Sequence, residues 1–489
     1  MLGLLHFDSF PALWLLVLHS WIALGFGQTD LSLRVLGFLI GLGVVGMILW
    51  TARQFRGGVP LISMVLFAMS PTVVLFGGEV RGYGLGVVCL LFVLGAMWNL
   101  TEDPAPWSIV AAVVAAVLAV QSAFGSSIFL FGFCLAGGIV ALRNRRGASI
   151  GILLGVGAVA AASILPYLRT MARYGEWNMI VQSPIEISWF FRKFTEAVAG
   201  SPMVAVWIVL FVFSTGVCLR RAFRDDPSVS RRERDLALFL PVATAAGLIG
   251  FVAYLKTLSV PTQSWYYMPA MAILAVYFEA AVDMAVRRSV PGRVLRMVLV
   301  VAVGLLTVPE AWRGAHMRMT NLDRVAAEIA SRCAPDDLVV LTPWYAGVTF
   351  ERYYRGKAPW VSVPDFEERR FQPYPDFKRK MTEREPIRPV LERIGRTLES
   401  GHKIWLVNGL PFLPEGQRPE ALPPAPHAPV GWSLGAYEWA WVRQAAYFVQ
   451  THATRLESIP VPVEGPVNPF ENLTLEVIGG WRRAEGSQP

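Results

Sequence analysis

The stretch LSLRVLGFLIGLGVVGMILWT, residues 31–51, is an almost unbroken apolar run that is long enough to cross a lipid bilayer as a helix. A spanning helix needs about 20 mostly apolar residues. It must be helical because its backbone polar groups find no water in the hydrocarbon layer. Arg53 and Arg56 follow this run directly. Apolar runs bounded by basic loops recur along the chain, and they predict an α-helical polytopic membrane protein.

The composition supports this prediction. The 489 residues are 54% hydrophobic and only 16% charged, whereas soluble domains carry about 25% charged residues. The formal net charge is +8. Because the arginines crowd the short loops between apolar runs, we interpret this charge as a determinant of membrane topology and not as a nucleic-acid surface.

Ten segments have the length and composition of spanning helices: 31–51, 58–76, 83–100, 107–124, 126–142, 149–167, 203–220, 236–254, 265–285 and 293–310. Another apolar helix is expected over 10–27. It either crosses the membrane or lies along the outer interface, with Trp14, His19 and Trp21 at headgroup level. Glycines four residues apart, Gly37/Gly41 and Gly151/Gly155, predict close helix packing.

Four groups of arginines follow the first, fifth, seventh and ninth spans. They are Arg53 and Arg56; Arg143, Arg145 and Arg146; Arg220, Arg221, Arg224, Arg231, Arg232 and Arg234; and Arg287, Arg288, Arg293 and Arg296. Counting spans places all four groups on one side, which the positive-inside rule makes the cytoplasm. This parity predicts a bacterial inner (plasma) membrane protein whose segments 77–82, 168–202 and 255–264 face outward.

The composition changes at about residue 311, where charges, prolines and short β-like runs appear. We therefore expect a transmembrane domain over 1–310 and a small extracytoplasmic α/β C-terminal domain over 311–489. In this domain VAAEIASRC, PVLERIGRTLESG and YEWAWVRQAAYFVQTHATRL are expected to be helices. The runs LVVLTPW, KIWLVNG and LTLEVIGGW are expected to be strands, and the proline-rich residues 411–430 a loop.

Several kinds of chemistry find no motif in this sequence. The four cysteines form no CxxC pair, and the six histidines are scattered. There is no HExxH, nucleotide P-loop or GxSxG pattern. The sequence therefore indicates neither a metal centre nor a nucleotide site, and a lipid-borne substrate fits it better.

One outward-facing constellation lies in FAMSPTVVLFGGEVRGYGL, residues 67–85, where Glu79, Arg81 and Tyr83 stand between two apolar runs. Charges at this depth are costly and tend to be functional. The pair could be a structural ion pair or part of a solvated loop. It could instead line a cavity in which the planar fork of Arg81 holds a phosphate and Glu79 orients it.

A second constellation is HFDSFPALWLLVLHSW, residues 6–21. Asp8 precedes Pro11 and the apolar helix, which is the position of a helix N-cap. The alternative interpretation is that this carboxylate is a general base toward an acceptor hydroxyl.

The third constellation, LKTLSVPTQSWYYMPAM, covers residues 255–271 and carries Lys256, Gln263, Trp265, Tyr266 and Tyr267. It is either an aromatic belt or a rim that contacts sugar and phosphate. The loop 168–202, with Arg169, Arg173, Trp177, Trp189, Arg192 and Lys193, is either an interfacial segment or an acceptor-binding lid.

These motifs resemble the GT-C superfamily of polytopic membrane glycosyltransferases, in its bacterial branch of protein mannosyltransferases and lipid A aminoarabinose transferases. The residues that match the family's pattern are Asp8, Pro11, Leu13, His19 and Trp21, then Arg34, then Ser70, Pro71, Glu79, Arg81, Tyr83 and Leu85. WYYMPAM and DDLVVLTP are similar to later landmarks of the family. Phe10, Ala12, Gly77-Gly78 and Trp265 depart from its pattern.

The resemblance implies a GT-C-like inverting transferase. It would move a sugar from a polyprenyl-phosphate donor to a lipid, glycan or protein acceptor on the outer face. The family's usual base lies on an acidic loop after a further N-terminal span, upstream of the matched part, so Asp8 is the substitute base. Arg81, with Lys256 as a second candidate, would stabilise the leaving phosphate. Glu79 would orient Arg81 or help place a divalent ion. The alternative is a non-catalytic GT-C-derived subunit of a glycan or polysaccharide assembly system.

Overall fold

The computed structural model describes residues 11–168, 186–224, 226–258, 262–287, 289–425 and 434–482. Contacts between Cα atoms divide them into two compact units, one ending at Ala315 and the other beginning at His316. The first is a bundle of helices, and the second contains a five-stranded sheet.

In the described residues of the first unit, eight helical segments are long and apolar enough to cross a membrane, which makes the chain a multi-pass membrane protein. The helices of this unit are α1 (Ala12–Trp21), η2 (Ile22–Phe26), α2 (Asp30–Gln54), α3 (Leu61–Ser63), η3 (Met64–Ala68), α4 (Pro71–Phe76), α5 (Tyr83–Glu102), α6 (Pro106–Ser122), α7 (Ser126–Arg143), α8 (Gly147–Ala162), η4 (Leu165–Tyr167), α10 (Ile187–Ala197), α11 (Ser201–Phe223), α12 (Arg231–Leu258), η5 (Ser264–Tyr267), α13 (Met268–Val286) and α14 (Val290–Ala315).

Two of the ten expected spans are not among these eight segments. Residues 58–76 form no single helix, because α3 and the π-helical turn η3 are separated from α4 at Met69 and Ser70. Pro71 explains this break, since it starts α4 and disfavours helical backbone at the residue before it. The expected span 107–124 is α6, which has 17 residues.

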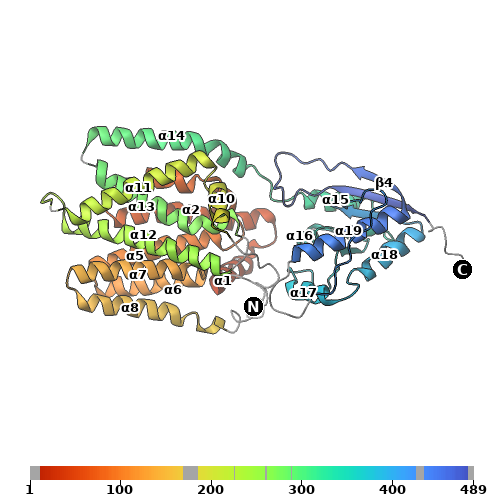
Figure 1. The fold of residues 1–489 in the computed structure, drawn as a ribbon, viewed down its shortest axis with the longest axis horizontal. Coiled ribbons are helices and arrows are strands. Elements are labelled where there is room, and N and C mark those ends of the chain that lie inside the picture. The colour runs from red at the N-terminus through yellow and green to blue at the C-terminus, as the bar shows by residue number, and fades with distance from the viewer. Residues whose placement is uncertain are drawn as a thin grey trace. The chain divides into compact units, whose positions relative to one another are not determined.

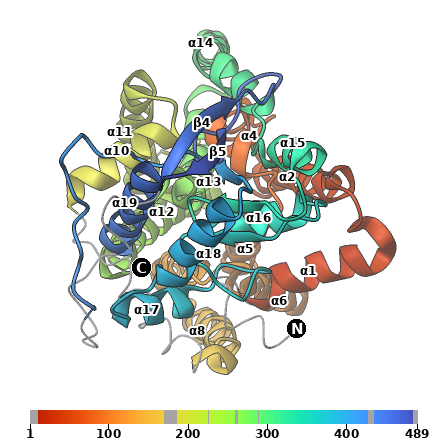
Figure 2. The ribbon, with the colours of Figure 1, turned by 90° about the vertical axis from the view of Figure 1, so that its right-hand side faces the viewer.

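The apolar N-terminal helix, whose orientation the sequence left open, runs across one end of the bundle (Figures 1 and 2). The backbone N–H of Ala12 donates to the Tyr167 hydroxyl at 3.2 Å, and that hydroxyl donates to Gln121 at 2.6 Å. Trp14 is buried against Leu36 of α2. This orientation matches the interfacial alternative and not a spanning helix.

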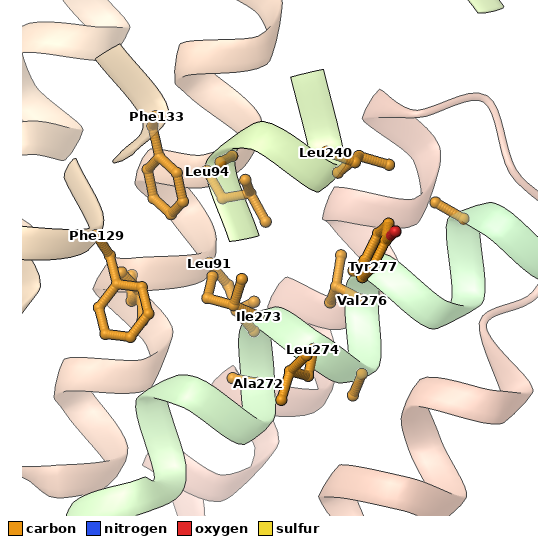
Figure 3. Close-up of a cluster of buried hydrophobic side chains, with 14 of the residues drawn as sticks. Leu91, Leu94, Phe129, Phe133, Leu240, Ala272, Ile273, Leu274, Val276 and Tyr277 are labelled. Carbon is orange, nitrogen blue, oxygen red and sulfur yellow. The ribbon is translucent and has the colours of Figure 1, made fainter. Parts of the chain in front are cut away.

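The centre of the bundle is formed by α5, α7, α12 and α13, whose large side chains interdigitate (Figure 3). In the segment Ser264–Val286, which contains α13, 89% of the most apolar 18 residues are buried. In α14 the corresponding share is only 17%, and this helix runs along the outside (Figure 1). A spanning helix that is buried on all sides needs no lipid-facing stripe. This explains why α13 can carry Glu279 and Asp283 without exposing them to hydrocarbon.

The four groups of arginines meet at one end of the bundle, which we call the arginine end. Arg232 donates to the carbonyl oxygen of Gln54 at 2.8 Å, and Arg143 donates to that of Ala222 at 2.7 Å. Arg221 and Arg287 both pair with Glu233, at 3.2 and 3.3 Å. The expectation that these loops lie together is confirmed.

The second unit is a small α/β fold, as expected. Its elements are α15 (Leu322–Arg332), β1 (Leu338–Leu341), α16 (Ala346–Tyr353), β2 (Trp360–Ser362), α17 (Tyr374–Thr382), α18 (Arg388–Glu399), β3 (Ile404–Val407), α19 (Leu434–His452), β4 (Ala453–Ile459) and β5 (Leu475–Trp481). The strand order is β2-β1-β3-β5-β4. The first three strands are mutually parallel, and β5 runs antiparallel to β3 and β4.

Alternate residues of β1 point to opposite faces of this sheet. Leu338 and Val340 belong to one buried cluster, together with residues of α17, α18 and α19. Val339 and Leu341 belong to the other, with residues of α15 and α16. Helices on both faces are the expected cover for a largely parallel sheet. The sequence prediction missed β2, α16 and α17, and it assigned the start of β4 to the preceding helix.

Candidate functional site

Close glycine contacts hold the turn between α4 and α5, residues 77–82, against its neighbours. A Cβ atom on Gly37 of α2 would lie 1.7 Å from the carbonyl oxygen of Gly78, and one on Gly84 would lie 2.1 Å from that of Gly77. Only glycine permits such backbone approaches. The turn that carries Glu79 and Arg81 is therefore fixed by backbone contacts to α2 and α5.

The close helix packing expected at the other glycines of the two spaced pairs is not found at the described residues. Within the described residues, no atom lies within 4 Å of a Cβ built on Gly41, Gly151 or Gly155, apart from the local helix backbone. The prediction of close packing is therefore wrong for these three. Gly37 does make a close contact, but its partner is a turn and not another helix.

Four aromatic side chains gather beside this turn, and we call them the aromatic cluster. Phe76 ends α4, Tyr83 begins α5, and Trp265 and Tyr266 lie in η5. Ring centroids of Phe76 and Trp265 are 4.6 Å apart, and Tyr83 lies 6.3 and 6.4 Å from Trp265 and Tyr266. Residues 182 or more positions apart in the sequence therefore form one contact group.

The charged residues of the turn lie next to this cluster. Glu79 is partly buried and Arg81 is exposed. Both lie within electrostatic range of the Tyr83 hydroxyl. The Trp265 indole N–H is buried without a geometrically satisfactory acceptor among the described residues, although the Tyr83 hydroxyl is near enough to interact with it. A carboxylate, a guanidinium and stackable rings are thus grouped at one place.

Three other residues predicted for this site have different surroundings. Tyr267 is only 5% exposed, and its hydroxyl lies 3.0 Å from the Thr262 hydroxyl, so it belongs to the core and not to a substrate-contacting rim. Gln263 is partly buried just before η5, and Lys256 is exposed in the last turn of α12.

Helix α10 supports the site from the side. The indole N–H of Trp189 donates to the carbonyl oxygen of Thr262 at 3.2 Å, while Arg192 stacks over the Trp189 ring. At the C-terminus of α10 the hydroxyls of Ser70 and Thr72 both donate to the carbonyl oxygen of Ala197. The Ser-Pro motif therefore joins α10 to the start of α4.

The sequence analysis missed several of these positioning residues. Phe76 carried a signal, because it is an aromatic residue inside the same constellation as Tyr83. The contact of Ser70 and Thr72 with α10 carried no sequence signal, because local spacing does not reveal a hydrogen bond between residues 125 or more positions apart.

Some predicted site residues lie outside the described part. Asp8, the candidate base, is one of them, and so are Arg169, Arg173 and Trp177. Arg288 of the fourth arginine group also lies outside the described part. Lys193 is described and pairs with Glu196 at 2.7 Å. Within the described ranges no group of three or more His, Cys, Asp or Glu side chains is arranged to hold a metal ion.

Comparison with known proteins gives no independent assignment. The chain matches no family model, and no curated protein is significantly similar to it. The functional argument therefore rests on the residues of the chain itself.

Proposed function

We propose that this protein is a GT-C-type membrane glycosyltransferase that uses a polyprenyl-phosphate sugar. The observation that carries the proposal is the grouping of Glu79 and Arg81 with Tyr83, Trp265 and Tyr266. This grouping lies at the turn of the bundle opposite the arginine end. By the positive-inside rule that turn faces away from the cytoplasm of a bacterial inner membrane.

The geometry suits a sugar joined to a phosphate. Aromatic faces carry partial negative charge and attract the weakly positive C–H groups on one side of a sugar ring. Arg81 presents a planar fork of donors to phosphate oxygens. Glu79 accepts hydrogen bonds from Arg81 or from sugar hydroxyls. The glycine contacts at Gly37 and Gly84 hold both charged residues in place before the substrate arrives.

The reaction would be a single displacement with inversion. The acceptor hydroxyl oxygen attacks the anomeric carbon, and the bond between that carbon and the phosphate oxygen breaks with its electron pair. Polyprenyl phosphate leaves, and Arg81 stabilises the negative charge that develops on it. The hydroxyl proton passes to a carboxylate, for which Asp8 is the candidate from the sequence.

One observation favours the second candidate, a non-catalytic subunit of a glycan assembly system. Among the five grouped residues, Glu79, Arg81, Tyr83, Trp265 and Tyr266, the carboxylate is that of Glu79. If it is committed to orienting Arg81, those residues alone provide binding without a base. Such a subunit would bind the same sugar phosphate and transfer nothing.

The test is sugar transfer in membranes that contain the full chain and a radiolabelled polyprenyl-phosphate sugar. We expect Arg81→Ala to lower the rate by about 100-fold or more, the usual cost of losing a transition-state donor. Glu79→Gln should also reduce it. Arg53→Ala removes an exposed arginine at the arginine end and is the matched control. Donor binding without transfer by the parent would support the subunit, and an equal effect of Arg53→Ala would contradict the site.

A further inference from the structure

A separate hollow lies at the arginine end, between the C-terminal turns of α7 and α11 and the first turns of α12. Its volume is about 360 Å³. Three arginines, Arg143, Arg224 and Arg234, line it together with apolar residues. We call it the Arg143–Arg234 hollow. It belongs to the same unit as the proposed transferase site but shares no residue with it.

The positive charge of this hollow is not neutralised by its described lining, which contains no acidic residue. The neighbouring carboxylates of α12 already have partners. Glu233 pairs with two arginines outside the hollow, as described above. Asp235 accepts a hydrogen bond from Asn144 at 2.8 Å and lies 3.6 Å from Arg231. The three positive charges of the lining repel one another, so an anion in the hollow would stabilise the arrangement.

The hydrogen-bond donors point to the same kind of ligand. The Nε–H group of Arg234 is buried and has no acceptor among the described residues. Arg143 donates one N–H to the carbonyl oxygen of Ala222, which holds its guanidinium in place and leaves other donors for a ligand. A phosphate group offers several acceptor oxygens to such guanidinium forks.

The apolar part of the lining indicates what carries the phosphate. Ile139, Phe223 and Leu238 belong to three helices that are apolar enough to span the membrane. Phe223 is 69% exposed in the described structure. An occupant with both a phosphate and hydrocarbon chains would cover these side chains and meet the arginines, which a small soluble anion cannot do.

We propose that the Arg143–Arg234 hollow binds the phosphate of an anionic phospholipid headgroup, with the acyl chains against Ile139, Phe223 and Leu238. Basic pockets between spanning helices on the cytoplasmic side are suited to such headgroups. The ligand chemistry is a phosphate ester. In this proposal the hollow binds a lipid of the surrounding leaflet and takes no part in sugar transfer.

The test is native mass spectrometry of the purified full chain in detergent, titrated with phosphatidylglycerol. The double variant Arg143→Gln/Arg234→Gln should raise the dissociation constant for the lipid by about tenfold or more. The control Arg53→Gln/Arg145→Gln removes the same charge from exposed positions at the same end and should change it by less than about twofold. Equal loss in both double variants would overturn the proposal.

Two further measurements are needed. One tests whether lost charge or damaged packing weakens lipid binding, and the other tests whether the ligand is a phospholipid or a free anion. Arg143→Lys/Arg234→Lys retains the charge and should recover most of the affinity. If it binds as weakly as the glutamine variant, the loss reflects damaged packing and the proposal fails. Millimolar inorganic phosphate should not displace the lipid, and displacement would overturn phospholipid as the occupant.

Discussion

The two ends of the helical bundle are built differently. At the arginine end, charges pair across helices, as Arg296 does with Glu279 at 2.5 Å and Asp283 at 3.6 Å. At the other end, backbone contacts between glycines fix a turn, and aromatic rings surround one glutamate and one arginine. Where charges are buried and paired, they fix the fold. At the other end Arg81 is exposed beside stackable rings, and we propose that it binds a ligand.

The largest expected effect on stability comes from Arg296. This side chain also donates to the carbonyl oxygen of Val59, so its loss would leave Glu279 and Asp283 buried without a counter-charge. We expect Arg296→Ala to destabilise the bundle by about 3 to 5 kcal/mol. Thermal unfolding in detergent measures this. Arg293→Ala, an exposed position on the same helix, should cost less than about 0.5 kcal/mol. Similar losses in both variants would remove the contrast between the two ends.

The next effect concerns Gly37. Alanine there would force the carbonyl of Gly78 away, and we expect Gly37→Ala to cost about 1 to 3 kcal/mol. It should also weaken donor binding, because the turn carries Arg81. Gly41→Ala lies one helical turn away with open space around it, and it should stabilise α2 by about 0.5 to 1 kcal/mol. Paired thermal and binding measurements on the two variants decide whether the turn needs this contact.

A carboxylate that has no ion pair among the described residues provides a comparison with the paired Glu279. In the sheet-containing unit, burial raises the pKa of the Glu438 carboxyl to about 7. The folded state therefore binds more protons than the unfolded state between about pH 4.5 and 7. The stability of this unit should fall across that window as pH rises, by about 1 to 2 kcal/mol after allowance for solvent screening.

Hydrogen exchange of the sheet amides in the full chain measures this pH dependence. Glu438→Gln should remove it, and a variant with unchanged pH dependence would refute the assignment. Glu457→Gln on the exposed strand β4 is a suitable control.

The smallest expected effect on stability is that of Arg81. Because it is exposed, Arg81→Ala should change the unfolding temperature little, equivalent to less than about 0.5 kcal/mol. The same variant should lose sugar transfer. A large destabilisation would place Arg81 with Arg296 as a structural residue and remove the distinction between the ends.

The sequence predicted the long elements because hydropathy and length are local signals. The helices α2, α5, α11 and α14 lie where apolar runs predicted them. Counting the spans between the arginine groups correctly predicted that the four groups lie at one end of the bundle. The break at Ser70 was missed, because an apolar run reads the same whether its helix is continuous or interrupted. The short strand β2 was missed because its three residues carry no periodicity.

The residues of the candidate site were predicted in part. Tyr83, Trp265 and Tyr266 came from two separate motifs, and the structure brings them together. Tyr267 is adjacent in sequence yet points into the core. Spacing cannot distinguish it from Tyr266, because both lie on one turn of 3₁₀-helix and only tertiary packing decides which is exposed.

Photolabelling tests the central claim most directly. A polyprenyl-phosphate sugar with a photoreactive group on the sugar should be bound by the full chain in membranes, activated by light and mapped by peptide mass spectrometry. The account predicts labelled peptides from residues 71–85 and 262–268, and competition by unlabelled donor should abolish the label. Label at the arginine end, or label that the unlabelled donor does not displace, would contradict it.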